Sequence, residues 1–172
     1  MLAKAGLDVN SLECGTHWPY DDESQRALAA AGHEPTALHN NCSGKHAGFA
    51  CLGCLMARGR GASAAEFLRG YVQPDHPLMQ EVSSAVQAAT GCDLSRAPNG
   101  TDGCSIPTYG IPLRQLALGF ARMATGIGLN AGHTNAALRL RRAIAQAPFM
   151  VGGSGRFDTR VMQYFGERVC CK

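Results

Sequence analysis

Glycine and proline residues close the helix-like segments of this sequence, and this punctuation constrains its fold more than any other feature. Apolar residues recur with helical spacing in several runs, among them the stretch from Pro77 to Thr90. We expect helices in the runs that end at Gly6, Gly32, Gly59, Gly91, Gly126 and Pro148. Strand-like segments are fewer and short, namely SIPTYGI, FMVGG and ERVCC. The sequence therefore predicts an α/β (α+β) fold in which helices pack on a small, incomplete sheet.

Several residues are suited to begin these helices. Asp21 or Asp22 can cap the helix over DDESQRALAAAG. Ser43 can cap the helix over GKHAGFACLGCLMARG, and Thr134 can cap the one over NAALRLRRAIAQA. Pro112 suits the first turn of PLRQLALGFARMATG. The helix after Ser43 is poor in strong helix formers, so tertiary packing must stabilise it.

Composition argues against several classes of protein. A length of 172 residues is most simply one domain over residues 1–172. The net charge of +3 is small and dispersed, which argues against nucleic-acid binding. No run approaches the roughly 18 consecutive apolar residues of a membrane span, and MLAKAGLDVN lacks a secretory apolar segment. We therefore expect a cytoplasmic protein, with no membrane partner, whose eight cysteines are reduced thiols.

The stretch LHNNCSGKHAGF brings a thiol and an amine to the start of a predicted helix. Cys42 stands just before that helix and Lys45 lies in its first turn, so the pKa of the Cys42 thiol should be lowered. A second thiol, Cys104, follows Asp102 in the glycine-bounded turn GTDGCSIP. If the fold joins the two loops, two thiolates and a neutral lysine would make an incomplete zinc site. Spacing alone leaves open a nucleophilic Cys42, and Asp102 could orient a water or an amine or merely shape its turn.

Other candidates are weaker. Ser43 is favoured as a helix cap over a nucleophile beside His46, and the SGK stretch lacks the spacing of a phosphate-binding loop. Cys51 and Cys54 form a lone C-x-x-C inside an apolar helix, which favours a place in the core. The glycine loop VGGSGRFDTR, with Arg156, could hold a carboxylate or be an ordinary strand-to-helix turn.

Taken together and in order, these segments resemble the thermolabile type II L-asparaginase family, the Rhizobium-type class. The matching pieces are LAKAGL, LECGTHWP, LHNNCSGKHAGF, PDHPL, DGCSIPTYGIPL and GRFDTRVM. The resemblance implies a fold similar to serine β-lactamases and bacterial glutaminases, with a sheet flanked by helices. It also implies hydrolysis of L-asparagine to L-aspartate and ammonia.

The resemblance implies a metal site as well. The family binds zinc through two cysteines and a lysine, which match Cys42, Cys104 and Lys45 in this sequence. Zn²⁺ is then a bound cofactor that the chemistry does not require. A ligating lysine must lose its proton, which arginine cannot do, and the chain has only three lysines among its 16 basic residues.

Catalytic and substrate-binding roles are implied for four further positions. Asp102 matches the acid beside the metal, and Lys172 matches a catalytic lysine. Arg156 and His46 are the expected contacts to the small amide substrate, L-asparagine.

The sequence also departs from the family's pattern. The Arg-Ser-x-x-Lys-Pro segment and the Ser-Gly-Glu loop, which supply the catalytic serines, have no counterpart here. We therefore expect the chain to be the middle to C-terminal part of an asparaginase domain, of doubtful activity alone, that could form a homodimer. The alternative is a non-catalytic metal- or partner-binding remnant of that fold, and a cysteine hydrolase using Cys42 is a third interpretation.

Overall fold

The structure is a computed structural model that describes residues 2–171. Within these residues helices dominate, and two short strands form one antiparallel pair. This confirms the predicted fold class of helices with a small, incomplete sheet. The chain divides into two compact units, one of Met1–Ala85 with Leu94–Gly110 and one of Val86–Asp93 with Ile111–Lys172. The expectation of one domain over residues 1–172 stays a prediction.

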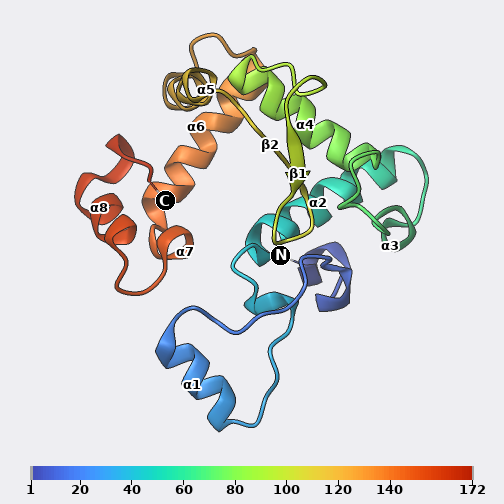
Figure 1. Ribbon diagram of the computed structural model, residues 1–172, viewed down its shortest axis with the longest axis vertical. Coiled ribbons are helices and arrows are strands. Elements are labelled where there is room, and N and C mark those ends of the chain that lie inside the picture. The colour runs from blue at the N-terminus through green and yellow to red at the C-terminus, as the bar shows by residue number, and fades with distance from the viewer. Residues whose placement is uncertain (1, 172) are drawn as a thin grey trace. The chain divides into compact units, whose positions relative to one another are not determined.

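The first unit holds most of the short helices and the strand pair (Figure 1). Its helical elements are η1 (Leu2–Ala5), η2 (Val9–Ser11), α1 (Asp22–Ala30), η3 (Ala37–His39), α2 (Ser43–Gly59), α3 (Ala64–Phe67) and α4 (Pro77–Thr90), of which α4 ends in the second unit. Its strands are β1 (Asn99–Thr101) and β2 (Pro107–Tyr109), with Asn99 opposite Tyr109. Asp21 caps α1 as predicted, because its carboxylate accepts the Ser24 N–H at 2.9 Å.

The core of the first unit forms around one face of α2. Its buried members are Ala50, Leu68, Tyr71, Val72, Leu78 and Met79. Gly53 of α2 allows the close approach, because a Cβ there would overlap the Leu68 side chain and lie 3.0 Å from Leu78 Cδ1. Helix α2 thus gains its stability from packing rather than from its own helix propensity, as its composition indicated. Cys54 packs against this core, which agrees with the structural interpretation of the C-x-x-C pair.

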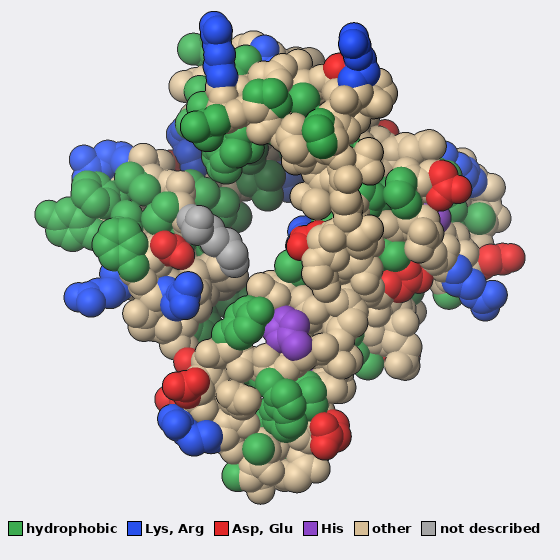
Figure 2. All heavy atoms as spheres, viewed as in Figure 1, with side chains coloured by type: hydrophobic (Ala, Val, Ile, Leu, Met, Phe, Trp, Pro, Cys, Tyr) green, Lys and Arg blue, Asp and Glu red, His purple; other side chains and the backbone are tan. Residues whose placement is uncertain are grey.

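The second unit is helical in its described residues. It contains α5 (Leu113–Thr125), α6 (Ala131–Gln146), α7 (Phe149–Gly152), α8 (Phe157–Phe165) and η4 (Gly166–Arg168). Gly126 ends α5 with φ +76°, a left-handed conformation that favours glycine. Large apolar side chains are exposed on several of these helices, and Figure 2 shows such side chains gathered over α8. No helix in the described part of the chain has the length and apolar character needed to traverse a lipid bilayer.

Every run predicted as a helix forms an α- or 3-10 helix, but two starts were predicted wrongly. Ser43 is the first residue of α2 rather than its cap, and Cys42 occupies the cap position without a side-chain hydrogen bond. Thr134 lies inside α6, where its hydroxyl donates to the Gly126 carbonyl, and Asn130 caps the helix instead. Pro112 directly precedes α5. In both wrong cases an asparagine a few residues upstream satisfies the first free backbone N–H groups.

The strand predictions were correct in one segment of three. PTY of SIPTYGI forms β2, and its partner β1 was not predicted. FMVGG forms the helix α7, because Pro148 before it has helical dihedrals of −61° and −31° and sets the first turn. ERVCC gives η4 and extended backbone rather than a strand, since no ladder partner lies beside it in residues 2–171.

Substitution of Gly53 by alanine should destabilise the first unit, because the new methyl group must displace Leu68 or Leu78. Overpacking of this kind costs about 1–3 kcal/mol. Gly48→Ala is the matched control, since Gly48 lies in the same helix with open space around it, and it should stabilise by about 0.5–1 kcal/mol. Urea unfolding measures both changes. A Gly53→Ala protein as stable as the wild type would contradict the packing of α2.

Candidate metal centre

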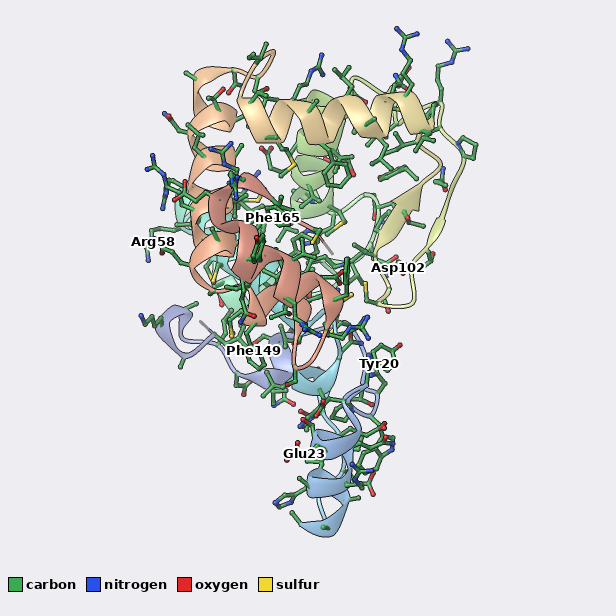
Figure 3. The ribbon with its side chains drawn as sticks, turned by 90° about the vertical axis from the view of Figure 1, so that its left-hand side faces the viewer. Tyr20, Glu23, Arg58, Asp102, Phe149 and Phe165 are labelled. Atoms are coloured by element: carbon green, nitrogen blue, oxygen red, sulfur yellow. The ribbon has the colours of Figure 1, made fainter. Side chains whose placement is uncertain are left out.

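The start of α2 and the turn between β1 and β2 bring four predicted site residues together. The ligand atoms of Cys42, Asp102 and Cys104 all lie within 4.8 Å of one another. Lys45 Nζ lies 3.3 Å from Cys104 Sγ and 3.7 Å from Asp102 Oδ2. Figure 3 labels Asp102 at the turn of the strand pair. The fold therefore joins the two loops, which was the condition for the metal site proposed from the sequence.

Asn40 positions Cys42 at the beginning of α2. The Asn40 side chain is buried, and its Oδ1 accepts the Cys42 N–H at 2.8 Å. Its Nδ2 donates to the Cys14 carbonyl at 2.7 Å, and its own carbonyl accepts the Ser43 N–H at 2.8 Å. Because these bonds hold the backbone on both sides of the loop, the Cys42 thiol is not needed to cap the helix and can bind another group.

The second loop is a tight turn that points Cys104 into the protein. The Asp102 N–H donates to the Ile106 carbonyl, and the Asp102 carbonyl accepts the Ser105 N–H, both at 2.8 Å. Ser105 has φ +73° and is the one non-glycine residue among residues 2–171 in the left-handed region. Such a conformation costs a side-chain-bearing residue about 1 kcal/mol. The turn leaves Cys104 buried, beside Cys14 and Leu12 in a small apolar cluster.

A buried histidine–tyrosine pair fixes the helix turn that carries Lys45. His46 and Tyr71 are both fully buried, and His46 Nδ1 lies 2.6 Å from the Tyr71 hydroxyl. That hydroxyl also accepts the Glu13 N–H at 3.1 Å. A hydroxyl can both accept from Glu13 and donate to His46 Nδ1. The other ring nitrogen, Nε2, is buried and has no hydrogen-bond partner among residues 2–171.

Burial sets the protonation state of this pair. It lowers the pKa of His46 to about 4, with the Lys45 charge adding to the effect. It also raises the pKa of Tyr71 to about 12. Both groups are therefore neutral near neutral pH, and a neutral pair can be buried at moderate cost. The pair fixes the rotation of the first turn of α2 and hence the direction of Lys45.

The side chains of the cluster are linked by hydrogen bonds, from Lys45 to Cys104 and from Cys104 to Asp102. Burial raises the pKa of the Cys104 thiol, whose sulfur donates to Asp102 Oδ2 at 3.2 Å. The hydrogen bond from Cys104 in turn lowers the pKa of Asp102. Burial opposes the charge of Lys45, but its hydrogen bond to Cys104 and the nearby acidic groups outweigh burial and raise its pKa. Without a metal, an ammonium, a thiol and a carboxylate thus hold one another in place.

The donor set fits zinc. Thiolates and a neutral amine are ligands that Zn²⁺ accepts, and ligands of a tetrahedral zinc at 2.0–2.3 Å stand roughly 3.5 Å apart. The sulfur atoms of Cys42 and Cys104 lie within 4.8 Å of each other and Lys45 Nζ lies 3.3 Å from Cys104 Sγ, so small side-chain shifts suffice. Each ligand must lose its proton on binding, and that proton goes to solvent. Asp102 remains the charged neighbour that accepts the hydrogen bond of Cys104 and pairs with Lys45.

The remaining predicted site residues lie elsewhere. Arg156 belongs to the second unit, where it is exposed at the start of α8, after the turn that follows the helix α7. Lys172 lies outside the described residues. His46 contacts Tyr71 within the core rather than the open face of the cluster. The roles of these three residues in catalysis or substrate binding stay predictions.

Sequence reasoning missed the supporting residues Asn40, Tyr71 and Glu13. Asn40 did carry a signal, because an asparagine two residues before a backbone N–H that needs a partner is typical of a local side-chain turn. Tyr71 and Glu13 lie 58 positions apart, and no local pattern indicates their contact.

The fold and this cluster define a mixed α/β protein with a thiol, lysine and carboxylate site suited to a metal ion. The family model for L-asparaginase II matches residues 1–172, and the chain belongs to this family. This confirms the resemblance found in the sequence. No curated protein matches the chain.

Substitution of Tyr71 by phenylalanine should reduce stability by about 1–3 kcal/mol, because it leaves the partly buried Glu13 N–H and the buried His46 Nδ1 without their shared partner. Tyr164→Phe is the control, since Tyr164 is 80% exposed, and it should change stability by less than about 0.5 kcal/mol. Urea unfolding of the two variants gives the comparison. Equal stabilities would mean that the buried pair does not support the site.

Proposed function

We propose that this chain acts as an L-asparaginase-type amidohydrolase that converts L-asparagine to L-aspartate and ammonia. Membership of the L-asparaginase II family supports an amide substrate and a hydrolytic reaction. The observation that carries the proposal is the convergence of Cys42, Lys45, Asp102 and Cys104 on one site in a chain of that family. We further propose Zn²⁺ as the ion held by the two thiols and the amine.

The proposed roles follow from exposure and charge. The side chain of Asp102 is 47% exposed and that of Lys45 37% exposed, so both can be reached from solvent. Asp102 is then suited to accept a hydrogen bond from the ammonium group of an amino-acid substrate. A zinc ion bound here would supply a positive charge able to polarise a substrate oxygen.

Three further residues have proposed roles in substrate binding or catalysis. Arg156 carries a permanent positive charge, and its proposed role is to bind the substrate carboxylate. His46 is the other proposed substrate contact, and its position behind Lys45 would require a rearrangement for direct contact. Lys172 would serve as the base that activates a nucleophilic hydroxyl. We also propose a cytoplasmic location, since all eight cysteines are free thiols, which suits a reducing compartment.

A second candidate function is metal binding without catalysis. It is favoured by the composition of the cluster, which brings together two thiols, an amine and a carboxylate. Such a set is sufficient to hold an ion but not to activate a nucleophilic serine.

Release of ammonia from L-asparagine by the purified, zinc-supplemented protein tests the first function, with L-glutamine as the competing substrate. Asp102→Asn should lower kcat/KM at least tenfold, because it removes the carboxylate charge that faces the substrate ammonium. Asp75→Asn, an exposed acid outside the cluster, should leave it unchanged. Zinc binding without ammonia from either substrate would favour the metal-binding function instead.

Lys45→Arg should weaken zinc binding at least tenfold, because a guanidinium keeps its charge and cannot donate a lone pair to the metal. Lys4→Arg is the matched control at an exposed lysine and should retain the wild-type affinity. Competition with a chromophoric chelator measures the dissociation constant of each protein. Wild-type affinity in the Lys45→Arg protein would remove Lys45 from the ligand set.

A further inference from the structure

Cys42 and Cys104 form a thiol pair across two different elements. Cys42 precedes α2 and Cys104 lies in the turn after β1, yet their sulfur atoms are within 4.8 Å of each other. Cys42 also packs against the apolar cluster that contains Cys104. A disulfide requires the two sulfur atoms to approach to about 2 Å. The two sulfur atoms must therefore move closer, by rotation of the two side chains.

We propose that Cys42 and Cys104 form a reversible disulfide when the chain meets a hydroperoxide, so that this site is redox-sensitive. The pair differs in access, because Cys42 is half-buried and Cys104 is 4% exposed. A hydroperoxide therefore reaches Cys42 first, and Cys104 is the resolving thiol. Formation of this disulfide depends only on the thiol pair, whereas its competition with a metal rests on the proposed function.

The reaction balances with the groups present and one hydroperoxide. The Cys42 thiolate attacks the terminal oxygen of the hydroperoxide, the O–O bond breaks, and an alcohol or water leaves as the sulfenic acid forms. The Cys104 sulfur then attacks the Cys42 sulfur, the S–O bond breaks, and water leaves. Two thiols and one hydroperoxide thus give a disulfide, an alcohol and a water.

Neighbouring charges assist the second step. Asp102 Oδ2 accepts the Cys104 S–H at 3.2 Å and so orients the thiol, and the thiol proton leaves with the departing hydroxide as water. Lys45 Nζ, 3.3 Å from the same sulfur, stabilises the negative charge that develops on it. Cys104 therefore lies between the carboxylate that accepts its hydrogen bond and a cation that can stabilise its charge.

Oxidation and metal binding compete for the same sulfur atoms. A sulfur in a disulfide has no thiolate lone pair to give to zinc, so the oxidised chain should lose the ion. Conversely, a bound ion occupies both thiolates and should slow their oxidation. The cluster would then exist in a metal-bound reduced state and a metal-free oxidised state.

The test uses the full chain after removal of metal with a chelator, treated with hydrogen peroxide. Intact mass should fall by about 2 Da, peptide mapping should join the segments that contain residues 42 and 104, and dithiothreitol should reverse both changes. The Cys51→Ser/Cys54→Ser double variant removes the C-x-x-C pair of α2 and should behave like the wild type. Cys42→Ser and Cys104→Ser should each abolish the cross-link.

Two results would overturn the proposal. One is a gain of oxygen on Cys42 or Cys104 with no cross-link in the wild-type chain. The other is a cross-link that maps to Cys51 and Cys54 and disappears in their double variant. Circular dichroism checks that the Cys42→Ser and Cys104→Ser proteins are folded. If one of them is not, the peptide map of the wild-type chain still decides whether residues 42 and 104 are cross-linked.

A zinc-loaded sample separates this inference from the proposed function. Zinc should slow formation of the disulfide at least tenfold, and peroxide should release zinc to a chromophoric chelator. A disulfide that forms equally fast with and without zinc would contradict the proposed metal site while the thiol pair stands. Absence of the disulfide in metal-free protein that nevertheless binds zinc would overturn the redox inference alone.

Discussion

The site depends on how the N-terminal end of α2 is held, and the buried side chain of Asn40 holds it. One amide group bonds the Cys14 carbonyl on one side and the Cys42 N–H on the other, at 2.7 and 2.8 Å. Loss of such a buried partner leaves unsatisfied groups that cost roughly 1–3 kcal/mol each. Because the Asn40 side chain accepts the backbone N–H here, the side chains of Cys42 and Ser43 are not needed as caps. The Cys42 thiol therefore remains free to bind a metal or to react.

A second support acts one turn further along the helix. His46 is fixed by Tyr71 in the core, and Lys45, its neighbour in sequence, therefore projects to Cys104 and Asp102. The two supports set the translation and the rotation of α2 relative to the strand turn within the first unit. The four side chains of the cluster meet because both loops are rigidly held, one by a buried amide and one by a turn that tolerates a strained serine.

Much of the fold could be predicted from the sequence because helix ends are local features. The glycines that follow α1 and α5 end them where expected. The caps of α2 and α6 were predicted wrongly because Asn40 and Asn130, a few residues upstream of Ser43 and Thr134, accept the backbone N–H groups instead. Asn40 is buried, whereas Asn130 caps α6 locally from an exposed position. The strand pair joins residues whose contact depends on the whole unit, so β1 could not be found. The sequence predicted the cluster of side chains only on the condition that the fold joins the two loops, because the contact between Lys45 and Cys104 spans 59 positions.

The central claim is that the thiols of Cys42 and Cys104 and the amine of Lys45 hold one metal ion. X-ray absorption of the zinc-loaded protein tests it most directly, because it measures the atoms that surround the ion. The account predicts two sulfur neighbours at about 2.3 Å and nitrogen or oxygen neighbours at about 2.0–2.1 Å. A first shell of nitrogen and oxygen alone would contradict it.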